Sequence, residues 1–222
     1  MKVADAMTSE VKVVRPEASL KEVASILAEH RISGLSVVDD GGDVLGVISE
    51  GDILLKETGE VPRVLQRLRH HKEASAVASK VEARTAGEAM SAPAITVEPF
   101  WPLAEAAELM IEHGVKRLPV VEDGKLVGIL TRFDLVRAFA RSDAEIEREI
   151  REEALRGLAW PEQLQVTVRN GEVTLRGEVD SKFDAEALPS SIRHIPGVVS
   201  VDSELAGWDP DSSEKRVVSA HL

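Results

Sequence analysis

The chain contains one long motif twice, 83 residues apart. The segment AMTSEVKVVRPEASLKEVASILAEHRISGLSVVDD, which begins at Ala6, returns in altered form from Ala89 as AMSAPAITVEPFWPLAEAAELMIEHGVKRLPVVED. After one extra residue in the first copy, GVISEGDILL at 46–55 matches GILTRFDLVR at 128–137. A repeated unit of this size buries its apolar face against its twin. The repeat therefore predicts a paired architecture and indicates where a ligand site is expected.

Each repeat has the pattern of a helix, a strand hairpin and a second helix. The inward faces of the first helices are expected to carry Leu20, Val23 and Leu27 in copy one and Leu103, Ala106 and Met110 in copy two. The expected strands are 35–38 and 44–48, and then 118–121 and 126–130, with Asp-Gly turns between them. The second helices begin near Asp52 and Asp134, and their expected buried side chains are Ile53, Leu54, Leu55, Leu135, Val136 and Phe139.

Two further segments fit neither repeat. Between the copies, Val61, Val64, Leu65 and Leu68 form a helical stripe surrounded by basic residues. This pattern fits either an anion-binding or partner helix or a solvated linker helix, and charge runs favour the second. From Asp143 a charged helix precedes a hairpin with an Asn170-Gly171 turn, a short helix near Lys182 and a last strand over 198–205. The polar tail after Gly207 is expected to be disordered.

The composition is globular: 43% of the 222 residues are hydrophobic. The formal net charge of −12 opposes attraction to a nucleic-acid backbone or an anionic membrane surface. Of this charge, −8 lies in the region from Ser142 to the end, which has 17 acidic and 9 basic residues. The absence of cysteine excludes disulfides and thiolate chemistry. With no signal-peptide pattern and no apolar run of membrane length, we expect a cytoplasmic protein.

On these motifs, the repeats resemble the CBS domain, which occurs in pairs (Bateman modules), and VTVRNGEVTLRGEV with IPGVVSVDSEL resembles the BON domain. The resemblance implies an α/β (α+β) fold with two packed CBS domains and a small α/β BON domain. The expected boundaries are 1–58 for the first CBS domain, 59–84 for a linker with a basic helix, 85–141 for the second CBS domain, 142–207 for the BON domain and 208–222 for the tail.

The end of each repeat contains a Ser/Thr-x-x-Asp motif, formed by Ser49 with Asp52 and by Thr131 with Asp134. One interpretation is a capping box, in which the hydroxyl accepts from an early helix amide. The other is a ligand site, in which the helix amino terminus faces a phosphate and the Asp accepts from ribose hydroxyls. The CBS resemblance favours the second, because it implies that these four residues bind ribose and phosphate of adenosine nucleotides.

The two motifs have different neighbours. Copy two has the candidate phosphate contacts Lys116, Arg117 and Arg132, where copy one has Ser33, Gly34 and Glu50. Because arginine attracts a phosphate and glutamate repels it, we expect the copy-two motif to prefer a phosphorylated ligand and the copy-one site to be weaker. Ordinary surface charge is the alternative. The resemblance also maps adenine contacts onto Val11, Ile32, Ala94 and Val115, which fit a plain core equally well.

Other candidate chemistry is weaker. His30 and His113 occupy equivalent helix ends, where capping of carbonyls is favoured over metal binding. Trp101 is interpreted as an apolar contact at the entry to its helix rather than an anchor for a dimer or ligand. Pro189 is expected to interrupt a helix of the BON segment, which argues against a lipid-binding role carried over from that family. No catalytic motif was found, so an enzyme is not expected.

The leading hypothesis is a non-enzymatic, homodimeric regulatory protein. Its CBS pair would sense AMP, ADP or ATP, with S-adenosylmethionine or NAD as alternative ligands, and would relay the signal to a protein partner through the BON domain. The alternatives are a dimeric interaction scaffold without a small ligand and a nucleic-acid binder acting through the 61–72 helix. The net charge disfavours the nucleic-acid binder. No required cofactor or metal is expected.

Overall fold

The computed structural model describes residues 1–58, 79–156, 158 and 161–207. The predicted 61–72 helix and the tail from 208 onward lie outside the described residues. The chain forms two compact units, one made of residues 2–102 and 108–132 and the other of residue 1, 103–107 and the region from 133 onward.

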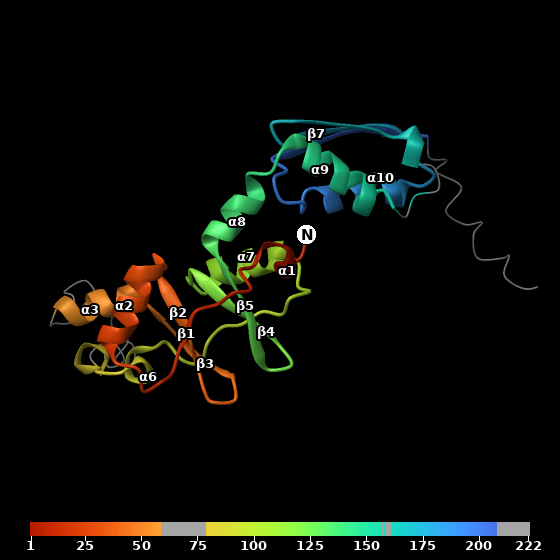
Figure 1. Cartoon of the computed structure of the whole chain (residues 1–222). Helices are drawn as coiled ribbons and strands as arrows, with labels where there is room; N and C mark the ends of the chain where they lie inside the picture. Colours follow the sequence, from red (N-terminus) through yellow and green to blue (C-terminus); the bar gives the residue numbers. More distant parts are fainter. Residues whose placement is uncertain (59–78, 157, 159–160, 208–222) are drawn as a thin grey trace, which may run out of the picture. The chain divides into compact units, whose positions relative to one another are not determined.

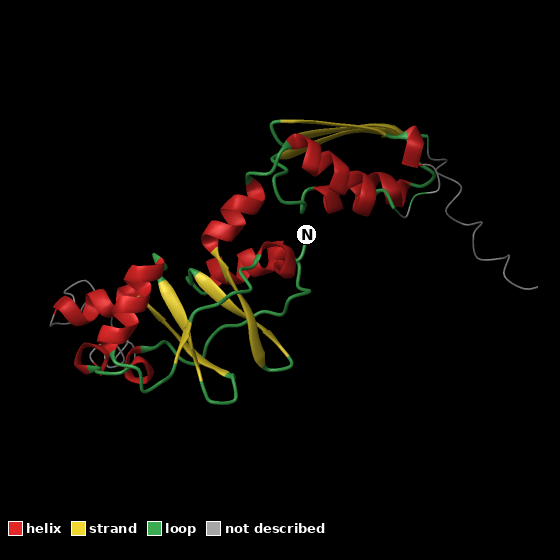
Figure 2. Cartoon of the chain, viewed as in Figure 1, coloured by secondary structure: helices red, strands yellow, loops and turns green. Residues whose placement is uncertain are grey.

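The first unit contains the strand hairpins of both repeats (Figures 1 and 2). In copy one, β1 (Val13–Val14) runs parallel to β2 (Gly34–Val38), which pairs antiparallel with β3 (Val44–Ser49). In copy two, β4 (Arg117–Glu122) pairs antiparallel with β5 (Lys125–Thr131), and a parallel bridge joins Val97 to Val120. The predicted hairpins are therefore confirmed. The short helix α1 (Val3–Ala6) precedes β1, and α2 (Leu20–His30) connects β1 to β2. Between the two hairpins along the chain come α3 (Glu50–Thr58), the short α6 (Ala86–Ala89) and α7 (Leu103–Glu112), whose first five residues belong to the other unit.

The two repeats contact each other through reciprocal pairs of equivalent residues. Thr8 bridges to Ile129, and the equivalent Ser91 bridges to Val47. The loops do the same at the turn, where Asp43 bridges to its own equivalent, Lys125. This reciprocity is the signature of a pseudo-two-fold axis between the copies. It follows that the amino-terminal segment of each repeat lies beside the second strand of the other.

The core confirms the predicted faces of the first helices but not those of the second helices. Val23 and Leu27 of α2 are buried, as are Leu103, Ala106 and Met110 of α7. In α3 and α8 (Arg132–Phe139), by contrast, the buried positions include Asp52, Asp134 and Ala138. Since a helix turns by about 100° per residue, this orientation places Leu54, Val136 and Phe139 on the outer side, where they are 63%, 61% and 56% exposed. The prediction that these three side chains are buried was wrong.

The second unit contains a three-stranded sheet with helices packed on one side (Figure 2). Strand β6 (Gln165–Arg169) pairs antiparallel with β7 (Glu172–Glu178), which runs parallel to β8 (Ser200–Ala206). The core joins these strands to α9 (Asp143–Glu149), the π-helical turn η1 (Ile150–Ala154) and α10 (Lys182–Ile192). A short 3-10 turn, η2 (Pro161–Gln163), precedes β6. The small α/β unit predicted from the sequence is confirmed.

Two local features of this unit bear on the sequence analysis. Asn170 and Gly171 both have positive φ, and their amides donate to the carboxylate of Asp143 at 2.8 and 2.9 Å. Pro189 lies inside α10 and is buried, so the predicted interruption of this helix was wrong. A proline removes one amide donor but keeps a helical φ, and α10 continues past Pro189 to Ile192. The argument from Pro189 against a lipid-binding role therefore no longer holds.

Candidate functional site

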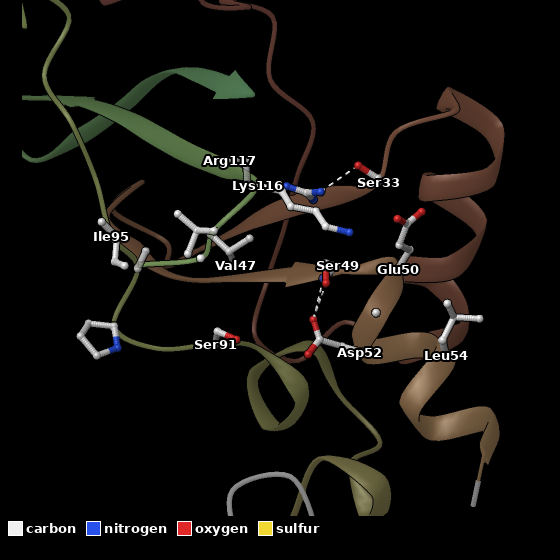
Figure 3. A pocket seen from close by; sticks show the side chains of 15 residues that line it. Ser33, Val47, Ser49, Glu50, Asp52, Leu54, Ser91, Ile95, Lys116 and Arg117 are labelled. Carbon is white, nitrogen blue, oxygen red and sulfur yellow. Dashed lines mark hydrogen bonds between the residues drawn. The ribbon is translucent and has the colours of Figure 1, made fainter. Parts of the chain in front are cut away.

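A cavity of about 390 Å³ lies between the repeats at the amino end of α3 (Figure 3). Its walls come from both copies. Copy one contributes the end of β3 and the first turn of α3, including Ser49 and Asp52. Copy two contributes the segments 91–95 and 114–117. This composition follows from the pseudo-two-fold arrangement, because each amino-terminal segment lies beside the other repeat's second strand.

The copy-one motif forms a tight local network. The Oδ2 atom of Asp52 accepts from the amide of Ser49 at 2.8 Å and from its hydroxyl at 2.9 Å. The carboxylate of Asp52 therefore satisfies the backbone amide of Ser49 at the start of the helix, and the Ser49 hydroxyl donates to the same carboxylate oxygen. This is the acidic half of a capping box. The capping interpretation and the ligand interpretation remain compatible, because Ser49 and Asp52 also line the cavity.

The other carboxylate oxygen of Asp52 binds a residue that lies outside both repeats. Lys80 Nζ lies 2.6 Å from Asp52 Oδ1 and also donates to Ser91 Oγ at 2.9 Å. The side chains of Lys80 and Asp52 are only 18% and 11% exposed. Both oxygens of Asp52 therefore have protein donors.

Arg117 crosses the pseudo-two-fold axis. It is 7% exposed, and its Nη2 donates to Ser33 Oγ of the other repeat at 2.8 Å. A Cβ atom on Gly34 would lie 1.1 Å from Arg117 Nη1. Since Gly34 and Arg117 are equivalent positions in the two repeats, only one side chain can occupy the space at the axis. Glycine in copy one thus makes room for arginine from copy two.

The buried guanidinium is not fully satisfied. Within the part of the chain that the structure describes, Arg117 Nη1 is buried and has no hydrogen-bond partner. Burial lowers the pKa of Arg117, while the negative charges of Glu50 and Asp52 favour its cationic form. An unsatisfied buried donor costs about 1–3 kcal/mol. Arg117 also lines the cavity, and an anion that accepted from Nη1 would offset this cost.

The positions of Lys116 and Arg117 correct one prediction from the sequence. Because they precede the strand of copy two, the sequence predicts that they serve the copy-two motif. They lie in the cavity with the copy-one residues Ser49, Glu50 and Asp52 instead (Figure 3). The physical reason is the pseudo-two-fold arrangement of the repeats, which brings the start of β4 beside the end of β3. The expected weakness of the copy-one site therefore loses its basis, because Lys116 and Arg117 line the same cavity as Glu50.

The remaining candidates of copy two have different surroundings. Arg132 is exposed, and its Nε donates to the carbonyl of Val115 at 3.0 Å. It is not among the residues that line the cavity. Thr131 ends β5, and Asp134 is buried in the first turn of α8, where its Oδ1 accepts from Arg137 at 2.8 Å.

Of the four residues predicted to contact adenine, two line the cavity and two do not. Ala94 and Val115 line the cavity that contains Ser49 and Asp52. Val11 and Ile32 do not line it, and Ile32 packs against the core of the first repeat. The sequence analysis missed Ser91, Ile95 and Lys80. Ser91 and Ile95 could have been found from the repeat, since in a pair of copies the amino-terminal segment of each lies beside the second strand of the other. Nothing in the sequence pattern pointed to Lys80.

Neither a metal centre nor a membrane-spanning element emerges from the described residues. Across residues 1–58, 79–156 and 161–207, no group of three or more His, Asp or Glu side chains is placed to hold a metal ion. His30 ends α2 and His113 follows α7, as expected for residues at helix ends. In the same ranges no helix is both long and apolar enough to cross a membrane.

Comparison with known proteins agrees with this architecture. The CBS domain model matches residues 3–58 and 86–141, and the BON domain model matches 142–206. The chain is 34% identical to the chloroplastic CBS domain-containing protein CBSX2 of Arabidopsis thaliana over 157 residues, which cover 65% of this chain and 66% of that protein. It is 29% identical to CBS domain-containing protein YhcV of Bacillus subtilis over 60% of this chain and 81% of that one.

A solved structure is similar as well. The crystal structure of CBSX2 in complex with AMP matches with a TM-score of 0.53 and 35% identity, covering 62% of this chain and 94% of the other. The first relatives found are matched over only about three fifths to two thirds of their own lengths. The paired repeats, the cavity between them and the family models together show that this chain belongs to the CBS-domain family, with two CBS domains followed by a BON domain.

Proposed function

We propose that this chain is a non-enzymatic regulatory protein that senses an adenosine nucleotide in the cavity between its CBS domains. The observation that carries the proposal is the distribution of groups around the cavity. Asp52 and Ser49 form an acceptor end suited to ribose, and Lys116 and Arg117 form a cationic end suited to phosphate. The volume of about 390 Å³ lies within the usual range for small-molecule sites.

Between these ends the walls are apolar. Val47, Ala94, Ile95 and Val115 line the cavity and offer surfaces for a planar base. Arg117 carries the strongest preference for an anion, because it is buried and has an unsatisfied donor among the described residues. A phosphate that accepts from Nη1 would form a charge-assisted bond. The similarity to CBSX2, whose crystal structure contains AMP, supports a ligand of this class.

Ligand binding would regulate through the interface between the repeats. The cavity walls come from both copies, so a ligand that fits one arrangement of the copies better than another shifts the equilibrium between them by its difference in affinity. We propose that the BON domain relays this shift to a protein partner. A cytoplasmic location stays a prediction.

A thermal-shift series tests the proposal. Purified protein is melted with AMP, ADP, ATP, S-adenosylmethionine and NAD, each alone. A ligand present at about 100 times its dissociation constant adds about 2.7 kcal/mol of stability, which raises the melting temperature by roughly 5–10 °C for a chain of this size. The Asp52→Ala variant should lose the shift. No shift with any of these compounds would contradict the sensor function.

One observation favours a dimerisation role, which is also the core of the scaffold alternative. Phe133, Val136 and Phe139 lie three residues apart on α8 and are 72%, 61% and 56% exposed. An exposed apolar stripe of this kind is typical of an interface. We propose that the CBS pair forms homodimers through it. Sedimentation of the wild type and of Val136→Glu checks this: a dimer converted to monomer is expected, and a monomeric wild type would contradict it.

A further inference from the structure

Both carboxylate oxygens of Asp52 already accept hydrogen bonds from other residues of the protein. Ser49 supplies two donors to Oδ2, and Lys80 supplies a cation to Oδ1 at 2.6 Å. A carboxylate has about four acceptor positions, but the approach to Oδ1 from the side of Lys80 is blocked by the ammonium. A ligand hydroxyl that binds Oδ1 from that side must replace Lys80.

Lys80 is well placed to be replaced. Its ammonium lies between Asp52 and Ser91, and both of these residues line the cavity. Lys80 itself belongs to neither repeat and lies just before α6 in sequence. The adjacent residue Val81 is bound through its carbonyl by Lys56 Nζ of α3 at 2.6 Å. The segment around Lys80 is therefore attached to α3 at two points, one of which is the candidate ribose acceptor.

From this geometry we infer that Lys80 is an internal competitor for the ligand's vicinal hydroxyls. In the ligand-free protein Lys80 neutralises Asp52 and holds the segment 79–85 against the site. A bound ribose takes Oδ1, and Lys80 leaves it. Binding at the cavity is thereby coupled to release of a segment outside both repeats. This inference rests on the proposed function, because it requires a ribose-containing ligand in this cavity.

The competition has a measurable signature in ligand discrimination. The wild type is expected to bind AMP only slightly more tightly than 2′,3′-dideoxy-AMP, because the two hydroxyls of AMP replace an existing partner of Asp52. In Lys80→Met, Oδ1 lacks its cation, and the same hydroxyls satisfy a partly buried carboxylate. The ratio of the two dissociation constants is expected to rise by about tenfold or more in Lys80→Met, the scale of one hydrogen bond to a charged group.

Calorimetric titration of both ligands into four full-length proteins tests this. Lys56→Met is the matched control, since it removes one lysine bond to the same segment without touching Asp52. Its discrimination ratio should equal that of the wild type. Lys80→Arg keeps a cation near Asp52 and should stay near the wild-type ratio. An unchanged or smaller ratio in Lys80→Met would overturn the inference while leaving the proposed function intact.

A second readout needs no substitution. Amide hydrogen exchange in residues 79–85 of the wild type is compared with saturating AMP and with saturating 2′,3′-dideoxy-AMP. Faster exchange with AMP alone is expected, and equal exchange with the two ligands would overturn the inference. If the wild type binds neither nucleotide, the proposed function fails, and the role of Lys80 fails with it.

Discussion

Gly34→Ala tests how the two repeats share the space at their pseudo-two-fold axis. The added Cβ would lie 1.1 Å from Arg117 Nη1, 2.3 Å from its Cζ and 2.8 Å from the carbonyl oxygen of Ile48. No heavy-atom contact of 1.1 Å can exist, so the guanidinium must leave its place. The carbonyl contact is also shorter than real Cβ contacts, and it requires a small backbone shift in β2.

The expected loss of folding stability in Gly34→Ala combines overpacking with the lost hydrogen bond from Arg117 to Ser33. Overpacking of a filled site costs about 1–3 kcal/mol. For about 2 kcal/mol, the melting temperature of a chain of this size falls by roughly 4–8 °C. Because the expelled guanidinium no longer faces the cavity, Gly34→Ala should also bind AMP about tenfold or more weakly, the scale of a charge-assisted hydrogen bond.

Urea unfolding of four proteins separates the two costs: the wild type, Gly34→Ala, Arg117→Ala and the double variant. If the contact with Arg117 dominates, the double variant is more stable than the sum of the single effects predicts, by about 0.5–3 kcal/mol. Gly51→Ala is the control for unfolding, since its Cβ would meet only Ser49 Oγ at an ordinary 3.5 Å. Additive effects in the double variant, or an unchanged stability of Gly34→Ala, would refute the reasoning.

Three further predictions concern the second unit, which contains the BON domain. Asp143→Ala removes the acceptor of two turn amides and should lower the free energy of unfolding by about 1–3 kcal/mol, measured by urea denaturation; no change would contradict the role given to this cap. For Glu149, burial raises the pKa, but hydrogen bonds from the Met1 ammonium and Arg141 leave it below its ordinary value. Such a group stabilises the fold above its unfolded pKa of about 4.3 and loses this effect as the pH falls. Glu149→Gln should therefore cost about 1–3 kcal/mol at pH 7 and clearly less near pH 3, as followed by unfolding at both values, and a cost independent of pH would count against the ion pair. Leu175→Ala in the fully buried core should cost about 2–5 kcal/mol, whereas Val199→Ala, at a position that is 61% exposed, should stay within about 0.5 kcal/mol; equal effects in the two variants would contradict the assigned core.

Much of the fold could be predicted from the repeat. Two copies of one pattern located the hairpins, and the Asn170-Gly171 turn located the hairpin of the last domain. The outer faces of α3 and α8 could not be predicted in the same way, because Leu54, Val136 and Phe139 are as apolar as core residues. Hydrophobic periodicity indicates which side chains a helix can bury, whereas the buried face of each of these helices includes the Asp near its amino end.

The candidate site could be predicted only in part, for a different reason. The motif residues Ser49 and Asp52 were found from spacing, but Lys116 and Arg117 were grouped with the wrong motif. Reading along the chain groups residues by copy, whereas a pseudo-two-fold pair builds a cavity from both copies. The contrast between Gly34 and Arg117 was visible in the sequence. That Gly34 leaves the space that the Arg117 side chain fills could be seen only in the structure.

The most direct test of the proposed function compares AMP with adenosine by calorimetric titration into the wild type and Arg117→Met. Arg117 is buried beside the cavity and has an unsatisfied donor among the described residues, so we predict that the phosphate of AMP binds there. The wild type should bind AMP about tenfold or more tightly than adenosine, and Arg117→Met should remove most of that preference. Failure of the wild type to bind AMP, or an undiminished preference for AMP in Arg117→Met, would contradict the proposed site.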